Sequence, residues 1–250
     1  MRRLGAGLAL ALLAVGPARA GIPSAEKISE AVAAANQASG RAGPLWIDVK
    51  LHIGDSPPLA SGTLASHPTG LARLELRSTR GFVERHLLQG ESYTASRDGR
   101  LLEGEERPFL PPVFLLQATS GAALRAALES FGVDSRRAVL GRVEERDCYV
   151  LGGRAPRGPD GTEPHRASLW VDVRSLEVVR IDRADGVRFR LGPFQSYDGI
   201  RAPSWIRIEM PGQPDARLDL ERVAPASAPA AAFGTDWLTS QVQGTSSANP

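Results

Sequence analysis

The chain has 250 residues, with 30 basic side chains against 28 acidic ones and one cysteine, Cys148. A single cysteine excludes an internal disulfide, so a hydrophobic core has to hold the fold together. Three arginines and no acids lie in residues 1–20, which leaves 27 bases against 28 acids in the other 230 residues, a net charge of −1. This balance argues against general nucleic-acid binding, which needs an excess of cations.

Residues 1–20, MRRLGAGLALALLAVGPARA, have the features of a secretory signal peptide. Two arginines precede a short apolar run, and Ala18 and Ala20 stand where a signal peptidase cleaves. The apolar run is too short to cross a bilayer. We therefore predict a periplasmic protein without a stable membrane span. The Arg2-Arg3 pair leaves the twin-arginine route as an alternative for export.

Residues 21–40, GIPSAEKISEAVAAANQASG, predict an amphipathic helix that opens the mature chain. Ser24 can cap its start, Ile28 and Val32 share one face, and Gly40 can end it.

Strand patterns follow the helix. LWIDVKLHI at 45–53 alternates apolar and polar side chains over nine positions, and LARLELRS at 71–78 and the segments WIRIEM and RLDLE do the same. Asp-Gly pairs, which favour tight hairpins, begin at Asp98, Asp185 and Asp198. Successive hairpins predict an antiparallel sheet with one apolar and one solvated face.

The longest alternating stretch is LWVDVRSLEVVRIDRADGVRFRL, residues 169–191. Its arginines and aspartates are predicted to form the solvated face of the sheet, with a lipid-headgroup or partner surface as the alternative. Trp46, Trp170 and Trp205 also project away from their aliphatic neighbours.

The middle segment, residues 111–132, breaks the strand rhythm. Pro111 and Pro112 suit a helix start, and the apolar spacing after Gly121 is helical. We predict that this segment is a helical lid, with Gly121 as a bend and Phe114, Leu115 and Leu116 directed into the sheet. The remaining divisions are a single domain over 21–238, an exposed loop at 152–166 and a disordered tail at 239–250.

The inventory of reactive side chains predicts no catalytic residue, metal ligand or cofactor. The four histidines stand in separate segments, and no nucleophile elbow or metal-binding spacing occurs. The acids Glu103, Glu105 and Glu106 are interpreted as a solvated turn rather than a glycosidase pair. Cys148 is expected to be a small buried side chain, because a redox thiol would need an activating neighbour or a second cysteine.

These patterns predict a mainly β (α+β) fold: a curved antiparallel sheet forming an unclosed β-barrel, with an N-terminal helix and a mid-chain helical lid. The short helical supply leaves an apolar hollow that a ligand can fill. Its predicted wall and lid residues are Ile47, Val49, Leu51, Leu74, Leu76, Phe114, Leu115, Val171, Phe189 and Ile208.

The order of these elements, and above all LWVDVRSLEVVRIDRADGVRFRLGPFQSYDGIRAPSWIRIEM, resembles the periplasmic lipoprotein-sorting, or LolA/LolB-like, superfamily. The resemblance covers about residues 22–238 and implies a carrier whose apolar cavity takes acyl chains of lipoproteins or other lipids. It also implies a buried cavity arginine, which the sequence does not assign to one position, and an envelope protein as donor or acceptor.

We therefore expect a monomeric periplasmic carrier that performs no chemistry. The rival interpretation is an interaction module with a filled core, which docks an envelope partner through the tryptophans or the arginine face. Exposure of Trp46, Trp170 and Trp205 would separate the two interpretations.

Overall fold

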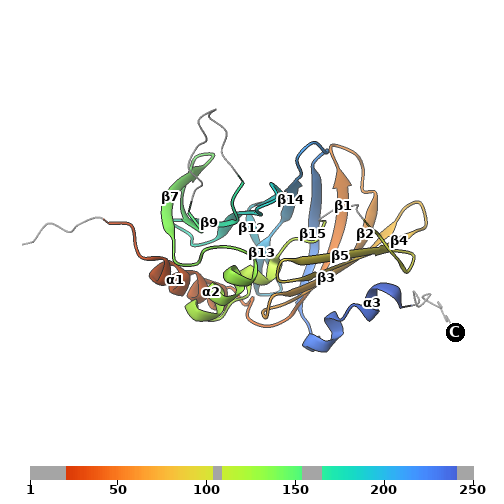
Figure 1. The fold of residues 1–250 in the computed structure, drawn as a ribbon, viewed down its shortest axis with the longest axis horizontal. Coiled ribbons are helices and arrows are strands. Elements are labelled where there is room, and N and C mark those ends of the chain that lie inside the picture. The colour runs from red at the N-terminus through yellow and green to blue at the C-terminus, as the bar shows by residue number, and fades with distance from the viewer. Residues whose placement is uncertain (1–20, 104–108, 154–164, 241–250) are drawn as a thin grey trace, which may run out of the picture.

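A large antiparallel sheet, strongly curved around helices on its concave side, organises the molecule in a computed structural model that describes residues 21–103, 109–153 and 165–240 (Figure 1). The helices are α1 Ala25–Ala38, η1 Val113–Leu116, α2 Gly121–Ser130, η2 Ala230–Phe233 and α3 Asp236–Thr239. The predicted signal peptide, the three acids Glu103, Glu105 and Glu106 in part, and most of the predicted tail lie outside the described residues.

Thirteen strands form this sheet within the described residues, in the order β6-β5-β4-β3-β2-β1-β15-β14-β11-β10-β9-β8-β7. They are β1 Leu45–Ile53, β2 Ala60–His67, β3 Leu71–Ser78, β4 Val83–Gln89, β5 Ser92–Arg97, β6 Arg100–Leu101, β7 Ala138–Val143, β8 Arg146–Leu151, β9 Ser168–Asp172, β10 Val178–Asp182, β11 Arg188–Leu191, β14 Trp205–Glu209 and β15 Ala216–Pro225. A separate hairpin pairs β12 Phe194–Tyr197 with β13 Ile200–Pro203.

The sheet has two arms that meet at the pairing of β1 with β15. One arm runs from β1 outward to β6, the other from β15 outward to β7, and β6 and β7 remain the two open edges. The predicted unclosed barrel is thus confirmed. The strand predicted at 45–53 is β1 itself, with Leu45, Ile47, Val49 and Leu51 buried and the residues between them half-buried.

The Asp-Gly pairs that begin at Asp98, Asp185 and Asp198 form hairpin turns, as predicted. They connect β5 to β6, β10 to β11, and β12 to β13. Asp98 and Asp198 have positive φ angles of 49° and 47°, and the glycine after each is also positive. This is the backbone that a tight hairpin requires and that Asp-Gly tolerates best.

The predicted helices are also present. Ser24 caps α1 by accepting a hydrogen bond from the backbone N–H of Lys27 at 3.3 Å. Gly121 has a different role from the bend expected for it: it is the first residue of α2, and a Cβ there would meet the Glu30 side chain at 2.7 Å. Glycine is needed at this position because α1 and α2 pack closely together.

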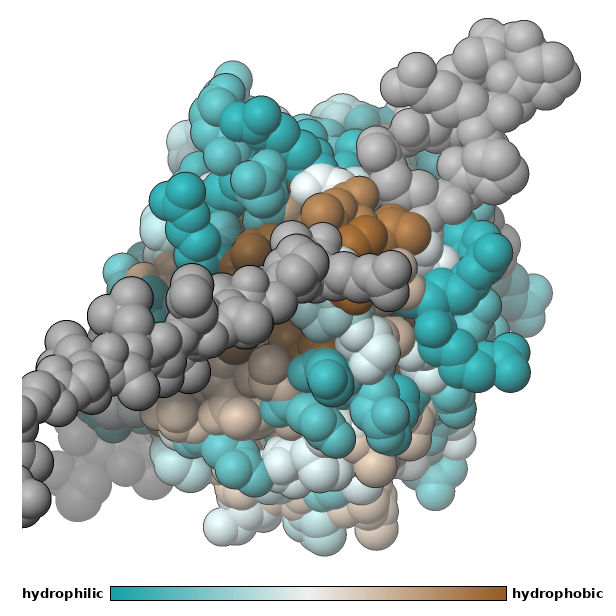
Figure 2. All heavy atoms as spheres, turned by 90° about the vertical axis from the view of Figure 1, so that its left-hand side faces the viewer, coloured by the Kyte–Doolittle hydropathy of each residue, from teal (hydrophilic) through white to brown (hydrophobic). Residues whose placement is uncertain are grey.

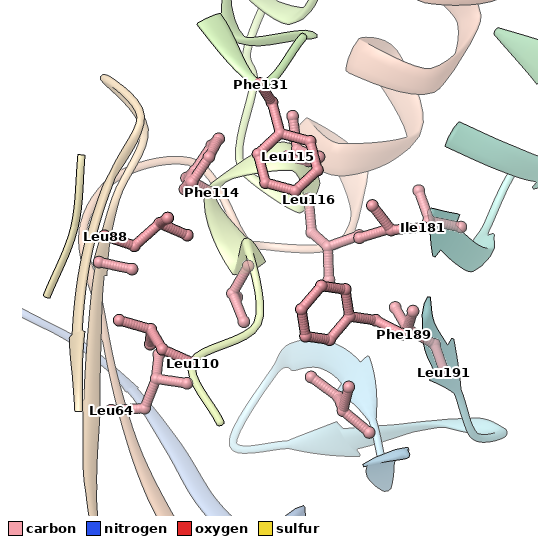
Figure 3. Close-up of a cluster of buried hydrophobic side chains, with 14 of the residues drawn as sticks. Leu64, Leu88, Leu110, Phe114, Leu115, Leu116, Phe131, Ile181, Phe189 and Leu191 are labelled. Carbon is pink, nitrogen blue, oxygen red and sulfur yellow. The ribbon is translucent and has the colours of Figure 1, made fainter. Parts of the chain in front are cut away.

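The core lies between the two arms. Figure 3 shows side chains from the β1–β6 arm, such as Leu64 and Leu88, facing Ile181 and Phe189 of the other arm, with η1 between them. Because η1 enters between the arms, the concave face is covered by side chains of the middle segment rather than by direct contact of one arm with the other.

The last described segment, residues 226–240, covers the convex face of the β1–β6 arm. Phe233 and Leu238 are buried there against Ala65 and Leu87, and Trp237 packs at their edge. Backbone carbonyls of this segment accept hydrogen bonds from the sheet, including one from Ser96 Oγ to Leu238 at 2.7 Å. The chain therefore supplies its own cover for an apolar patch on the outer face.

Replacing Phe233 with alanine should detach this cover and lower the free energy of unfolding by about 3–5 kcal/mol, the usual cost of removing a buried phenylalanine. Urea unfolding followed by circular dichroism would measure it. Ala231→Ser, at an exposed position of the same helix, is the control and should change stability little. A Phe233→Ala protein with wild-type stability would contradict the packing described.

Candidate functional site

The ten residues predicted to line an apolar hollow all lie in one continuous core cluster. Each is at most 6% exposed, and they come from both arms and from η1. The structure therefore brings them together. Their contact with a ligand stays a prediction, because their side chains now contact one another.

The middle segment occupies the interior as the apolar spacing predicted. Phe114 and Leu115 are fully buried, Leu116 is 1% exposed, and the ring of Phe114 meets that of Phe131 edge-on at 6.1 Å between centroids. These side chains fill the space between the two arms (Figure 3). Movement of the segment would be required before a chain could lie along the whole concave face.

Arg41 lies in the connection between α1 and β1, is only 1% exposed and forms hydrogen bonds to this segment. Its Nε donates to the carbonyl oxygen of Leu116 at 3.0 Å, and its Nη2 donates to Oδ1 of Asn36 at 2.8 Å. Its Nη1 donates to the carbonyl oxygen of Arg201, and the guanidinium lies over the ring of Phe194, 5.2 Å from the centroid.

Arg41 carries its charge in an environment that disfavours it. Burial lowers its pKa from 12.5 to about 10, although the charge of Glu177 acts in the opposite direction. Glu177 is paired with Arg201 at 2.7 Å, and no described carboxylate lies within ion-pair distance of Arg41. Carbonyl oxygens and an aromatic face therefore hold this cation, which ties η1 to two distant parts of the chain.

Gln117 provides a second polar attachment at the same place. Its Nε2 donates to the carbonyl oxygen of Gly43 at 2.7 Å, and Ser66 Oγ donates to its Oε1 at 2.5 Å. Asn36 donates to the carbonyl oxygen of Ala118 at 3.3 Å. The middle segment is thus fixed by a few hydrogen bonds at one end of β2, and elsewhere by apolar contact.

An apolar pocket of about 290 Å³ opens at the other end of β2, beside Ala60. Among the predicted cavity residues it is lined by Leu51 and Leu76, and Phe109 and Met210 extend its wall. Leu59, at 39% exposure, stands at its rim. The pocket is open while η1 remains in place.

One wall of the pocket carries an ion pair that the sequence did not predict. Glu84, 5% exposed, accepts hydrogen bonds on Oε1 from Nε and Nη2 of Arg97, at 2.9 and 2.5 Å. Its other oxygen lies 3.6 Å from Nε2 of His86, whose Nδ1 is 2.6 Å from the hydroxyl of Tyr93. Burial by itself would raise the pKa of Glu84, but the contacts with His86 and Arg97 outweigh it and lower the pKa to about 2.

No sequence pattern predicts this pair, because β4, VERHLLQ, is buried on both faces. Glu84, His86 and Leu88 face the concave side, whereas Arg85 and Leu87 face the convex side under residues 226–240. Without alternation of apolar and polar residues, the period-two pattern that marks a half-buried strand is absent.

Of the arginines in residues 169–191, Arg180, Arg188 and Arg190 lie on the convex face, as predicted, whereas Arg183 lines a pocket with Phe131 and Gly132. Arg180, Arg190, Arg207 and Arg217 stand opposite one another across four strands, β10, β11, β14 and β15. Three of them pair with neighbouring acids, of which Arg180 with Asp182 at 2.7 Å is one example. Acids between the arginines compensate the repulsion that such a row would otherwise produce.

The tryptophans do not form the exposed surface that the rival interpretation needs. Trp170 is 4% exposed, its indole N–H lies 3.0 Å from Asp182 Oδ2, and the guanidinium of Arg180 covers its ring. Trp46 and Trp205 are half-buried, and Trp46 packs against the cover formed by residues 226–240. Figure 2 shows instead that, on the side of α1, apolar side chains gather at the middle of the face within a hydrophilic surround.

The described residues contain no group of three His, Cys, Asp or Glu side chains placed to hold a metal ion. Cys148 is fully buried, and burial raises the pKa of its thiol. Within the same residues, no helix has both the length and the apolar composition that crossing a bilayer requires.

Comparison with known proteins relates this architecture to solved structures only, since no family model and no curated protein matches the chain. A domain from Vibrio parahaemolyticus, classed with outer membrane lipoprotein-sorting proteins, is similar at a TM-score of 0.52 with 12% identity, over 86% of this chain and all of that one. A LolA superfamily protein from Nitrosomonas europaea has a TM-score of 0.49 and 13% identity, over 87% of this chain and all of its own. A DUF1329 family protein from Desulfovibrio piger has a TM-score of 0.49 and 15% identity, over 86% of this chain and all of its own.

The likeness to the Vibrio domain confirms at the level of fold the resemblance that the order of elements indicated. The chain has a LolA-like fold: a curved, unclosed antiparallel sheet with helices on its concave side.

The low pKa of Glu84 makes the stability of this arm depend on pH. Because the folded-state pKa lies below that of the unfolded chain, the stabilisation is complete above about pH 5 and is lost as pH falls toward about 2. The shift from 4.5 to about 2 corresponds to about 3 kcal/mol. Glu84→Gln keeps a hydrogen-bond acceptor but binds no proton. Between about pH 5 and about pH 2, the unfolding free energy of this variant should therefore fall by about 3 kcal/mol less than that of the wild type.

Urea unfolding at both pH values would measure this difference. Glu221→Gln, which removes a carboxylate from an exposed pair with Lys50, is the matched control and should alter stability by less than about 1 kcal/mol. Equal pH dependence in wild type and Glu84→Gln would show that Glu84 is not held as a carboxylate by its neighbours.

Proposed function

We propose that the mature chain is a periplasmic carrier that holds acyl chains of lipoproteins or other lipids against the concave face of its sheet and performs no chemistry. The observation that carries this proposal is the separation of the two aliphatic arms by an inserted segment, with η1 side chains where a cargo chain would lie. Displacement of η1 would expose a continuous apolar surface from both arms.

The physical chemistry of the concave face suits reversible holding of such a cargo. An acyl chain is stabilised by about 0.8 kcal/mol for each methylene removed from water. Aliphatic walls impose no obligatory hydrogen bonds, so the chain can leave as it entered. Phe114, Leu115 and Leu116 cover the same walls in the empty protein, and therefore compete with the cargo rather than add to its binding.

Arg41 gives this competition a defined closed state. Its hydrogen bonds to Leu116, Asn36 and Arg201 join the middle segment to α1 and to β13. A buried cation without a carboxylate partner is strongly destabilising when its remaining contacts are lost. The hydrogen bond from Arg41 therefore holds Leu116 while η1 is in place. Once η1 leaves, water can replace the Leu116 carbonyl oxygen as the acceptor.

The LolA-like fold and the predicted export signal support the carrier class and the periplasmic location. The proposed partners are lipid or lipoprotein acyl chains together with an envelope protein as donor or acceptor, and the proposed state is a monomer.

Hydrogen exchange with and without a triacylated lipopeptide tests the proposal. Because cargo and η1 compete for one apolar surface, amides of residues 113–131 should exchange faster when lipopeptide is bound, whereas β1 and β15 should stay protected. Unchanged protection of residues 113–131, with lipopeptide demonstrably bound, would show that this segment is a fixed part of the core.

Replacing Arg41 with methionine should favour the open state. The variant removes three hydrogen bonds while keeping an unbranched side chain. A fluorescent fatty-acid probe should then bind about tenfold more tightly, because less of its binding free energy is consumed in displacing η1. Arg207→Met is the control, since Arg207 is exposed on the convex face and forms no ion pair within the described chain. Weaker binding by a folded Arg41→Met protein would contradict the competition.

A further inference from the structure

The pocket beside Ala60 has a composition that distinguishes it from the filled interior. Leu51, Leu76, Phe109 and Met210 form an apolar wall at the end of the concave face that lies away from η1. Its volume of about 290 Å³ is close to the lower end of the range for small-molecule sites, about 300–1,000 Å³. It is open in the structure, so a ligand can enter without displacing the middle segment.

The polar lining of the pocket is small and has no net charge. It consists of the Glu84–Arg97 ion pair and two neutral side chains, Ser78 and Gln213. Glu84 is 5% exposed and stays ionised, since its contacts hold its pKa at about 2. Glu84 and Arg97 lie on the neighbouring strands β4 and β5, so the ion pair stands at one side of the pocket. An apolar pocket with an ion pair at one side is suited to an amphiphile whose chain lies on the apolar wall and whose head lies beside that pair.

Arg97 has the donor that such a head group would need. Its Nε and Nη2 are both directed at Glu84, whereas its Nη1 has no acceptor among the described residues. The ring of Phe82, also in the lining, lies 4.8 Å from the guanidinium carbon. Because the carboxylate and the ring hold the guanidinium in place, a head group that binds Nη1 does not have to order this side chain first.

We propose that this pocket binds single-chain amphiphiles with an uncharged, hydrogen-bond-accepting head, such as the ester carbonyl of a monoacylglycerol, through Nη1 of Arg97. A free fatty acid fits less well, because its carboxylate would bring a second negative charge beside Glu84. An alkylammonium head fits less well because it offers no acceptor and meets the positive charge of Arg97. The site does not depend on the carrier function proposed above, since η1 stays in place.

Calorimetric titration of the mature protein with monolauroylglycerol, laurate and dodecylamine, each below its aggregation concentration, tests the head-group preference. Monolauroylglycerol should bind about tenfold more tightly than either charged amphiphile, the order expected for one uncompensated charge near the surface. Shortening its chain should weaken binding about fourfold for each methylene removed from the pocket wall. Equal or tighter binding of laurate would overturn the head-group assignment.

A pair of matched variants locates the site. Leu59 and Leu140 are exposed leucines, at 39% and 52%, and only Leu59 lines the pocket. Leu59→Trp should fill the mouth and weaken monolauroylglycerol binding at least tenfold, whereas Leu140→Trp should bind as wild type does. Wild-type binding by Leu59→Trp would place the amphiphile elsewhere.

Changing the charge of the pocket distinguishes a role of Glu84 in ligand choice from a merely structural one. Glu84→Gln leaves Arg97 uncompensated, so the preference should reverse and laurate should bind more tightly than monolauroylglycerol. If Glu84→Gln does not fold, Arg97→Lys keeps the charge but lacks the planar fork, and should weaken monolauroylglycerol binding while leaving laurate binding nearly unchanged. An unaltered preference in the folded variant would overturn the role of the pair.

Hydrogen exchange separates this site from the carrier function. Monolauroylglycerol at the pocket should leave the exchange of residues 113–131 unchanged, because η1 is not displaced. Faster exchange there, in both wild type and Leu59→Trp, would show that the amphiphile enters the space under η1, and would overturn the assignment to the pocket while supporting the carrier.

Discussion

The structure depends on one constraint: a sheet of thirteen strands with an aliphatic concave face must keep that face out of water. A twisted sheet of this width curls, but its two edges, β6 and β7, do not meet. Side chains from outside the sheet therefore have to complete the core, and α1, η1 and α2 supply them. The same deficit of covering side chains creates the surface on which we propose that an apolar ligand replaces η1.

Two buried charged groups mark the two ends of that surface, and each is stabilised differently. Arg41 has carbonyl oxygens and an aromatic ring around it, and burial lowers its pKa to about 10. Glu84 has a direct counter-ion in Arg97, and its pKa falls to about 2. The first arrangement attaches η1 to α1 and β13, whereas the second is an ion pair at the side of an open pocket. The chemistry available at the two ends is correspondingly different.

On the convex face, charged side chains are paired and the apolar patches are covered. Its arginine row is compensated by acids on the same or neighbouring strands, and the indole of Trp170 is covered by Arg180. On the β1–β6 arm the chain adds residues 226–240 as a cover, where Arg85 donates to the carbonyl oxygens of Trp237 and Ser240. An outer surface finished in this way offers little apolar area to a docking partner.

The sequence by itself determined those elements whose residues alternate locally: β1, β3, the Asp-Gly hairpins and the capped helix α1 follow from period and turn chemistry, because side chains of a half-buried strand must point alternately to core and water. It also identified the apolar residues of η1. Only the tertiary structure decided which arginine is buried, since the partners of Arg41 at Leu116 and Arg201 lie 75 and 160 residues away. The strand β4 was not predicted for a similar reason. Residues 226–240 bury its second face, so its sequence does not alternate between apolar and polar side chains. The Glu84–Arg97 pocket lies on that strand, so its existence could not be derived from local pattern.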